Sequence, residues 1–333
     1  MITRRRALIV WNPAAGRIWR PPPVPVVVRR LAAAGVQSEV RSAGDFRPPD
    51  LLGRDLVVVV GGDGTLHHLL PHLRDASLPV GLIPAGTGNV LARELRLPRD
   101  PYHAVDALLA GRVRPLELAA ANGVPFLLMA GAGLDGYLVG RVRAGLKRWF
   151  GVAAFWMAGA TEFWRYPLPV FTVHIGSESF EATQAFISNC RSYGGGLVLT
   201  PDADISRPGF HICLLQGRRH SRYPLYLWRV LAGTHRELPD VVYRQADMVR
   251  LEGPRSVLYQ LDGEPAGCLP VELHATRETL PFLVPWEEGT GREFPGVQRH
   301  RAALPASDAT SEGERSERDN VIGARARWAR LRL

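Results

Sequence analysis

The amino-acid sequence predicts two domains: an α/β domain with a parallel sheet, followed by an antiparallel β-sandwich. Three observations lead to this prediction. The chain has 333 residues, a length that favours two domains. Up to about residue 118, apolar strand-like runs alternate with helical stretches, as in a parallel sheet with helices on both faces. Beyond that point, short β-type runs separated by turn residues dominate, which is typical of a sandwich.

The first domain is expected to span residues 1–118. Its strands are predicted at 7–11, 55–60 and 79–83, and its helices at 26–36, 65–73, 89–97 and 102–112. The second strand holds four consecutive valines, Val57–Val60, followed by turn residues. Such a β-branched run indicates a strand that is buried on both faces. Pro98 ends the third helix.

The second domain is expected to span residues 119–285, and residues around 275–290 are a candidate for a return to the first domain. Its strands are predicted in the runs PLELAAA, PFLLMAG, PVFTVHIG, QAFISNC, GFHICLL, VVYR, MVRLEG, SVLYQLDG and PVELHAT. One helical stretch, at about 138–166, interrupts them. The polar residues 289–333 predict a disordered tail.

Composition and charge restrict the class of protein. A hydrophobic content of 46% and a charged content of 22% are ordinary for a globular protein, and the absence of a long apolar run argues against a spanning helix. The apolar run after the basic N-terminus is too short for a signal peptide, so we expect a cytoplasmic protein. Three scattered cysteines indicate neither disulfides nor a zinc site. A net charge of +9 favours anionic surfaces such as phospholipid, whereas no recognisable module for binding nucleic acid is present.

Three predicted strands end in unusual turns: Asn12–Gly16 (NPAAG), Gly61–Thr65 (GGDGT) and Pro84–Asn89 (PAGTGN). In an open parallel sheet all three turns lie at the carboxyl edge, where ligands bind. Glycines there let backbone amides point at an anion, and each following helix presents the positive end of its dipole. The pattern predicts a phosphate cradle made of separate loops, since no P-loop motif is present.

Polar side chains in these turns suit the same ligand. Thr65 and Thr87 can cap the helices that follow or bond phosphate oxygens. Asp63 is the residue that could hold Mg²⁺ against the phosphates. We therefore expect a site for the phosphates of a nucleotide, with Asp63 placed to hold Mg²⁺.

Together these motifs resemble the diacylglycerol kinase catalytic-domain family, which includes bacterial diacylglycerol kinases, sphingosine kinases and ceramide kinases. Further matches follow in order: GAGLDG at 131–136, RSYGGG at 191–196 and LDGE at 261–264. The resemblance covers roughly residues 5–285. It implies an α/β nucleotide domain, a β-sandwich lipid domain and a cleft between them. It also implies ATP-dependent phosphorylation of a lipid hydroxyl, and hence a peripheral association with membranes.

The resemblance also assigns roles to residues. It implies that the nucleotide is bound by Asn12, Gly61, Gly62, Asp63, Gly64, Thr65, Gly86, Thr87, Gly88 and Asn89. Asp262 matches the general base of bacterial members, and Glu264 stands beside it in the motif. Asp135 matches a position near the lipid headgroup in related kinases. A carboxylate in hydrogen-bond reach of the hydroxyl is what proton removal requires.

The sequence departs from the family pattern at two places, which bear on metal binding and on catalytic activity. His68 stands where members usually carry Glu, and Ser206–Pro208 replace a D-D-G that holds a structural Mg²⁺ in bacterial relatives. Although His67, His68 and His72 cluster, Pro71 and the lack of H-E-x-x-H argue against a metal site and for surface or capping roles. A catalytically silent lipid- or nucleotide-binding protein therefore stays open as an alternative. An NAD kinase is a second alternative, because GGDGT occurs there too.

Other questions stay open in the sequence. The run Gly131–Gly136 fits the dinucleotide fingerprint G-x-G-x-x-G, but no βαβ unit surrounds it. The segment 141–166 has a basic start and an aromatic face at helical spacing, and it either lies in a bilayer interface or packs onto the sandwich. The phosphorylated lipid, diacylglycerol or a sphingoid-type lipid, and a homodimer paired through an edge strand are also undecided.

Overall fold

The computed structural model describes residues 5–15, 23–141 and 162–285. The predicted tail and most of the segment 141–166 lie outside these residues. Within them, no helix is both long and apolar enough to cross a membrane.

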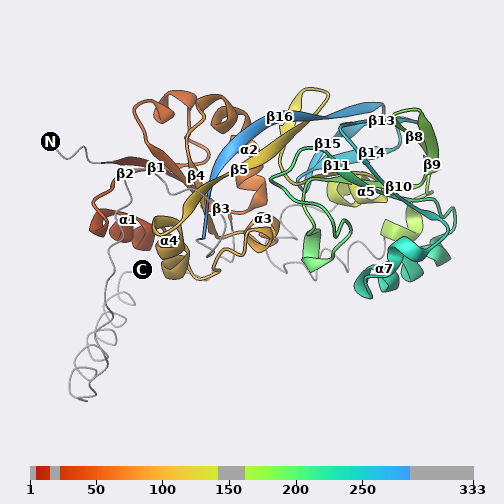
Figure 1. Cartoon of the computed structure of the whole chain (residues 1–333), viewed down its shortest axis with the longest axis horizontal. Coiled ribbons are helices and arrows are strands. Elements are labelled where there is room, and N and C mark those ends of the chain that lie inside the picture. The colour runs from red at the N-terminus through yellow and green to blue at the C-terminus, as the bar shows by residue number, and fades with distance from the viewer. Residues whose placement is uncertain (1–4, 16–22, 142–161, 286–333) are drawn as a thin grey trace, which may run out of the picture. The chain divides into compact units, whose positions relative to one another are not determined.

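The first part of the chain alternates strands and helices, as predicted (Figure 1). Its elements are β1 (Arg6–Trp11), α1 (Val24–Ala33), β2 (Gln37–Ser42), the 3₁₀ turn η1 (Pro48–Leu51), β3 (Leu56–Gly61), α2 (Asp63–Ala76), β4 (Val80–Pro84), α3 (Val90–Glu94) and α4 (Pro101–Leu109). The predicted helix 89–97 is shorter than expected, because Arg96 adopts a left-handed backbone conformation with φ of 54° and the helix ends before it. Strand β2 was not predicted, since its sequence QSEVRS contains one apolar residue.

Strands dominate the rest of the described chain. They are β5 (Arg112–Ala121), β6 (Val124–Phe126), β7 (Met129–Gly133), β8 (Phe171–Ile175), β9 (Glu178–Ala182), β10 (Gln184–Ser188), β11 (Phe210–Leu215), β12 (Val241–Ala246), β13 (Met248–Glu252), β14 (Leu258–Leu261), β15 (Glu264–Cys268) and β16 (Val271–Val284). The helices are α5 (Leu134–Arg141) and α7 (Tyr223–Leu231), and the 3₁₀ turns are η2 (Gly194–Gly196), η3 (His220–Arg222) and η4 (His235–Glu237). The sequence did not predict α7.

One mixed sheet runs through both halves, in the order β2-β1-β3-β4-β16-β13-β8-β9, with β5 attached to β16 and β6 attached to β5. Strands β1 to β4 pair in parallel, and Phe282 of β16 pairs in parallel with Val80 of β4. Further along, β16 pairs antiparallel with β5 and β13. Figure 1 shows β16 running from the α/β half into the other half. This long strand joins the two halves covalently and by hydrogen bonds.

The valine strand β3 is buried on both faces, as predicted. Val57 and Val59 pack into a cluster with Leu66 and Leu70 of α2, whereas Val58 packs on the opposite face with residues of α1 and α4. Side chains alternate between the two faces of a strand, so every valine of the run meets a helix layer. The parallel arrangement brings the carboxyl ends of β1, β3 and β4 to one edge.

The second sheet, β12-β11-β10-β7-β14-β15, is antiparallel throughout. Its inner side chains, such as Ile187 and Ile212, share one buried cluster with Val249 and Leu273 of the first sheet. This packing of two sheets face to face is the β-sandwich that the sequence predicts. The fold class, an α/β domain plus an all-β sandwich, is thus confirmed.

Candidate active site

Asp63 ties two of the predicted loops together. It begins α2 directly after Gly62, and its carboxylate oxygens accept hydrogen bonds from the backbone N–H groups of Val90, at 2.8 Å, and Leu91, at 3.0 Å. These two amides are at the N-terminus of α3, where helical amides have no partner of their own. The pKa of the Asp63 carboxyl lies above its ordinary value. Burial raises it, the hydrogen bonds from the two amides lower it, and the negative charge of the nearby Asp262 raises it further.

Asn12 links the first loop to the second. Its side-chain Nδ2 donates to Oγ1 of Thr65 at 3.0 Å, and its Oδ1 accepts from the backbone N–H of Ala14 at 2.9 Å. Thr65 is buried, although it lies in the first turn of α2. The structure therefore brings together the loops after β1, β3 and β4, from which the phosphate cradle is predicted.

The loop glycines leave room for one another and for protein side chains. A Cβ on Gly61 would lie 2.7 Å from Oγ1 of Thr65, and a Cβ on Gly62 would lie 2.8 Å from the Cα of Gly86. Both distances are shorter than real contacts of a Cβ atom. At Gly61 and Gly62, loop packing is thus sufficient reason for glycine, whether or not a phosphate also lies there.

Asn89 closes the third loop on itself. Its side-chain oxygen accepts from the N–H of Gly86 at 3.0 Å, and its amide donates to the Gly86 carbonyl at 2.8 Å. Asn89 also has a left-handed backbone, with φ of 47°, which asparagine tolerates better than most residues. The side chain of Thr87 is exposed at the tip of this loop.

Asp262 lies in the two-residue turn between β14 and β15. Asp262 and Gly263 have φ of 53° and 86°, so both central residues of this hairpin are left-handed, as a type I′ turn requires. The turn directs the Asp262 side chain inward. Its oxygens accept from the N–H groups of Leu127 at 2.9 Å, Leu128 at 2.7 Å and Met129 at 3.0 Å.

His67 supplies the fourth hydrogen bond to Asp262. Its Nδ1 lies 3.1 Å from Oδ2 of Asp262, and because a carboxylate only accepts, Nδ1 carries the proton. Burial lowers the pKa of the imidazole, but the hydrogen bond and the charges of Asp262 and Glu264 outweigh burial, so the pKa lies above its ordinary value of 6.5. The side chain of Asp262 is 3% exposed and that of His67 is 12% exposed, so the histidine is the more accessible partner.

Glu264 lies over the start of α2. A Cβ on Gly64 would be 2.5 Å from Oε1 of Glu264, so the carboxylate approaches the backbone where the helix dipole is positive. Asp63, Asp262 and Glu264 therefore lie within one region, where His67 is bonded to Asp262 and feels the charge of Glu264. The predicted catalytic residues of the LDGE turn thus meet the predicted nucleotide loop.

Asp135 lies behind this region in a polar network. It is buried at the start of α5, where it accepts hydrogen bonds from the hydroxyl of Tyr193 and, at 2.9 Å, from Nε2 of Gln260. Oε1 of Gln260 in turn accepts from the N–H of Gly263 at 2.6 Å. Gln260 thereby connects Asp135 to the Asp262 turn. The contact of Asp135 with the lipid headgroup stays a prediction.

The neighbourhood of Asp135 also shows why GAGLDG is not a dinucleotide fingerprint. The run does follow strand β7 and begin helix α5. However, both neighbours of β7, β10 and β14, are antiparallel to it. A βαβ unit needs parallel strands, so this run has no such surroundings.

The acidic residues of segment 201–210 pair with arginines. Asp204 accepts from Arg114 at 2.7 Å, and Asp202 accepts from Arg236 at 2.7 Å. Among the residues that the structure describes, no three His, Cys, Asp or Glu side chains are placed to hold a metal ion.

Sequence reasoning missed Gln260 and the backbone amides of 127–129. It gave His67 a surface or capping role, whereas the side chain is largely buried and bonded to Asp262. Only His67 left a signal. It follows Asp63 by four residues in a predicted helix, and residues at that spacing lie on the same face. The amides 127–129 carry no side-chain signal, because they act through the main chain.

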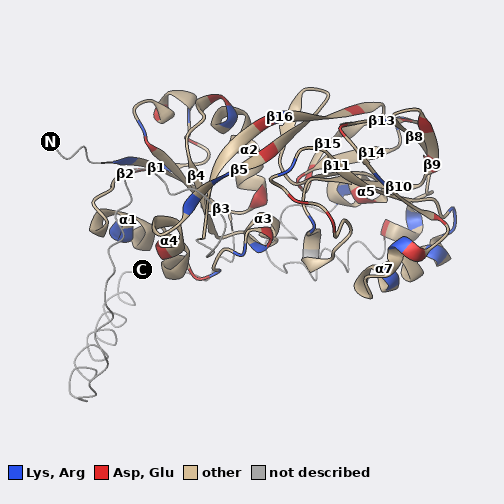
Figure 2. Ribbon diagram, in the orientation of Figure 1, with Lys and Arg blue, Asp and Glu red and all other residues tan. Residues whose placement is uncertain are grey.

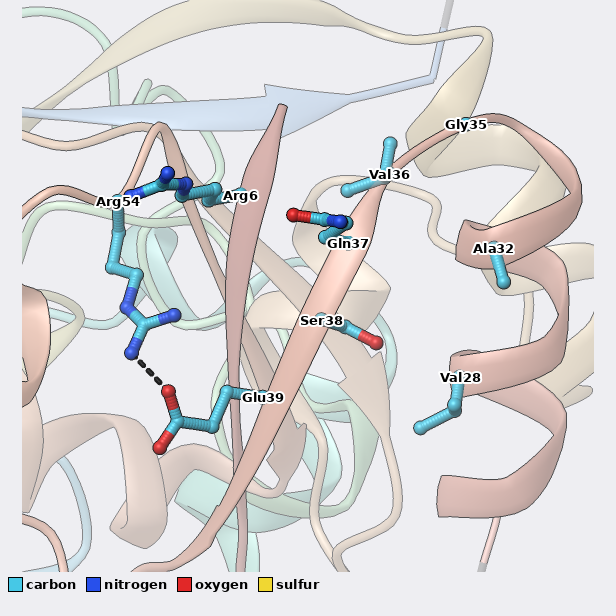
Figure 3. A pocket seen from close by; sticks show the side chains of 9 residues that line it. All are labelled: Arg6, Val28, Ala32, Gly35, Val36, Gln37, Ser38, Glu39 and Arg54. Carbon is cyan, nitrogen blue, oxygen red and sulfur yellow. Dashed lines mark hydrogen bonds and ion pairs between the residues drawn. The ribbon is translucent and has the colours of Figure 1, made fainter. Parts of the chain in front are cut away.

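A pocket of about 760 Å³ lies elsewhere, beside the edge strand β2 (Figure 3). Arg6 and Gln37, the first residues of β1 and β2, are among its lining residues, and the ion pair of Arg54 with Glu39 borders it. It thus lies at the amino ends of the parallel strands. Ligands of such sheets bind at the carboxyl ends, so we do not assign the nucleotide to this pocket.

Two family models match the chain in tandem. The diacylglycerol kinase catalytic domain matches residues 6–121, and the YegS C-terminal NAD kinase beta sandwich-like domain matches residues 129–284. A crystal structure of a diacylglycerol kinase from Bacillus anthracis superposes with a TM-score of 0.63 at 18% identity, over 85% of this chain and 98% of that chain. At this identity the likeness shows the fold.

Curated relatives match up to 85% of the chain. A diacylglycerol kinase from Mycobacterium tuberculosis is 35% identical over 243 residues, which cover 70% of this chain and 78% of the relative. A diacylglycerol kinase from Bacillus subtilis is 27% identical over 296 residues, or 85% of this chain and 98% of the relative. The chain therefore belongs to the diacylglycerol kinase family of lipid kinases.

Proposed function

We propose that this protein transfers the γ-phosphate of ATP to the hydroxyl of a membrane lipid. One observation carries the proposal: a buried carboxylate, Asp262, faces the loop that holds Asp63, and the same region joins three loops at the carboxyl edge of a parallel sheet. We propose diacylglycerol as the acceptor, because the named relatives are diacylglycerol kinases. A sphingoid-type lipid is the competing acceptor.

The two halves divide this work. We propose that residues 1–118, with the end of β16, bind ATP and that residues 119–285 bind the lipid. Glu94 of α3 accepts from the N–H groups of Arg191 and Ser192, at 3.2 and 3.1 Å, so contacts between the halves fix them around the site. A peripheral association with the membrane follows from the substrate.

Mg²⁺ fits this site as a partner of the nucleotide. The carboxylates of Asp63, Asp262 and Glu264 would repel triphosphate, so a cation must accompany it. Each oxygen of Asp63 accepts one backbone hydrogen bond and keeps a lone pair, so Asp63 would hold the ion together with the phosphates. The ion would neutralise charge on the phosphates during transfer.

Asp262 is proposed as the general base. Oδ1 accepts from two backbone amides, and Oδ2 accepts from one amide and from His67. Of these four donors, His67 alone reaches Asp262 through a movable side chain, so it is the donor that a lipid hydroxyl can replace. The hydroxyl proton then passes to Oδ2, the hydroxyl oxygen bonds to the γ-phosphorus, and the bond to the β-phosphate oxygen breaks to release ADP.

The test of this proposal is phosphate transfer from labelled ATP, with Mg²⁺, to lipids in detergent mixed micelles. The lipids are diacylglycerol, a sphingoid base and ceramide, each assayed separately. We expect labelled phosphatidic acid from diacylglycerol. Transfer to the sphingoid base alone would correct the substrate, and ATP binding without transfer to any lipid would favour a silent binding protein instead.

The His67–Asp262 pair predicts opposite effects of pH on activity and stability. Protonated His67 donates a charge-assisted bond, which competes more strongly with the lipid hydroxyl. We therefore expect kcat/KM for the lipid to fall as pH falls through the raised pKa of His67. Stability behaves in reverse: because the folded pKa lies above 6.5, the pair's contribution is complete below pH 6.5 and is lost as pH rises through the folded value.

The matched variants are His67→Asn, whose side-chain N–H can still donate to Asp262, and His67→Ala, which has no donor. Neither changes charge with pH, so the acid limb of kcat/KM should move to lower pH in both. In the same variants, the unfolding temperature should lose the pH dependence that His67 causes. An acid limb that is unchanged in His67→Asn would show that His67 does not control access to Asp262.

A further inference from the structure

The buried side chain of Gln260 bonds two parts of the candidate site. Gln260 is 1% exposed and lies in β14, two residues before Asp262. Its Nε2 donates to Oδ2 of Asp135 at 2.9 Å, and its Oε1 accepts from the N–H of Gly263 at 2.6 Å. Because a carboxylate only accepts and a backbone N–H only donates, the two partners fix the orientation of the amide. Both polar atoms of this side chain are thus used at the site.

The geometry of the sheet explains why Gln260 faces Asp135. The neighbours of Gln260 along β14, Tyr259 and Leu261, belong to the core of the sandwich, so Gln260 points to the other face of its sheet. Helix α5, with one acidic and one basic residue, lies beside β14 (Figure 2). Asp135 is in the first turn of this helix. The contact between Gln260 and Asp135 therefore joins α5 to the strand that leads to Asp262.

Gly131 in the neighbouring strand β7 makes room for this contact. Gly131 pairs with Gln260 across the two strands. A Cβ at Gly131 would lie 2.9 Å from Nε2 of Gln260 and closer still to Oδ2 of Asp135. A larger residue would therefore push the two side chains apart. The first glycine of the run GAGLDG thus has a local reason, because it lets Asp135 and Gln260 meet.

The hydrogen bond to Gly263 acts on the turn that carries Asp262. In this two-residue turn the flanking residues Leu261 and Glu264 pair with each other, whereas the N–H of Gly263 donates to the Gln260 side chain. That N–H belongs to the peptide group that directly follows Asp262. Holding this group restrains the backbone of Asp262, and with it the direction in which the Asp262 carboxylate points.

We infer that Gln260 is a positioning residue, which holds the turn so that Asp262 keeps the orientation that a general base requires. Gln260 acts through Gly263, and Asp135 fixes the other end of its amide. The inference rests on the proposed function in that Asp262 is the base. A displacement of about 1 Å in a catalytic site costs on the order of 100-fold in rate. The contribution of Gln260 should therefore be found in kcat rather than in the binding of ATP.

Gln260→Met is the first test, because methionine has a similar length but no N–H donor and only a weak acceptor. We expect kcat for lipid phosphorylation to fall about 10–100-fold, with KM for ATP within about twofold of the parent. The control is Tyr226→Phe, which removes a buried hydroxyl that donates to Asp240 in a different core cluster. The control should lose stability and keep kcat. Thermal unfolding checks that each variant is folded at the assay temperature.

An exchange of the two partners is the sharper test. Asp135→Asn alone brings two amides together and Gln260→Glu alone brings two carboxylates together, so each should lower kcat. In the double variant the amide at position 135 can donate to the carboxylate at position 260, which can still accept from Gly263. We expect kcat of the double variant, at saturating lipid, to be about tenfold above that of Gln260→Glu alone.

The titration of His67 reports the position of Asp262 without an assay of activity. The hydrogen bond to Asp262 and the charges of Asp262 and Glu264 hold the pKa of His67 above 6.5, against the effect of burial. In Gln260→Met the turn is no longer held by this side chain. The pKa of His67, followed by NMR, should therefore fall toward 6.5 in that variant and rise again in the double variant.

Unchanged kcat in folded Gln260→Met would overturn the inference. A fall in kcat with an unchanged pKa of His67 would also overturn it, because Asp262 would not have moved. Failure of the double variant to recover kcat, although it is folded, would count against it in the same way. A parent that phosphorylates no lipid would instead refute the proposed function, and the His67 titration would still decide whether Gln260 positions Asp262.

Discussion

Replacing Asp262 with asparagine is expected to lower kcat/KM for lipid phosphorylation by about 10²–10⁴-fold, the usual contribution of a positioned base. Asparagine is the appropriate substitution here, because Asp262 has a left-handed backbone with φ of 53° and asparagine tolerates that conformation. Alanine would add backbone strain and confuse the result. ATP binding, measured by calorimetry, should change much less than kcat/KM, since the base acts on the lipid hydroxyl.

The same substitution should also destabilise the protein. Asp262 accepts hydrogen bonds from three backbone N–H groups and from His67. An amide nitrogen in place of one oxygen would face at least one of these N–H donors, which costs about 1–3 kcal/mol for a buried donor without a partner. Activity is therefore compared well below the unfolding temperature of the variant. An Asp262→Asn protein that is folded and keeps kcat/KM within a few-fold of the parent would refute Asp262 as base.

The parts of the fold that the sequence predicts well are those with strong local signals. The valine run of β3 needs two apolar layers whatever surrounds it, and both are present. This feature depends on neighbouring residues, so one sequence is enough to find it.

Helix α7 shows where local signals fail. Its sequence YPLYLWRVL has apolar residues on both the buried face and the exposed face, and a short, largely apolar run of this kind is not easily told from a buried strand. Strand β2 fails for the opposite reason, because an edge strand with one apolar residue shows no run at all. In both cases the surroundings decide the structure, and a single sequence does not contain them.

The candidate site contains residues with a clear sequence signal and residues without one. The loops 61–65 and 84–89 carry recognisable glycines. However, Gly62 and Gly86 must be glycine because each lies against the backbone of the other loop. The pairing of His67 with Asp262 joins residues 195 positions apart, and the amides of 127–129 that hold Asp262 have no side-chain signature. Sequence therefore points to the residues that carry charge, and the fold adds the partners that position them.

The contact between the two glycine loops leads to the second large prediction, for Gly86→Ala. A Cβ on Gly86 would lie 2.5 Å from the Cα of Gly62 and 2.8 Å from Oδ1 of Asn89. The backbone of Gly62 cannot rotate away as a side chain would, so the two loops must separate. Asp63 follows Gly62 directly, and its bonds to Val90 and Leu91 span the gap, so separation weakens them.

We expect Gly86→Ala to lower kcat/KM for ATP by about 100-fold, as a displacement near 1 Å in a binding site does, and stability by about 1–3 kcal/mol. Gly62→Ala should behave alike, because its Cβ would lie 2.8 Å from the Cα of Gly86, at the same contact between the loops. The control is Gly44→Ala, whose Cβ would make an ordinary 3.6 Å contact with Ser42 Oγ. Steady-state kinetics with ATP varied, together with urea unfolding, measures both effects. If Gly86→Ala matched Gly44→Ala in both, close packing of the loops would not be what organises the nucleotide site, and the glycines would have to be explained by the bound phosphates themselves.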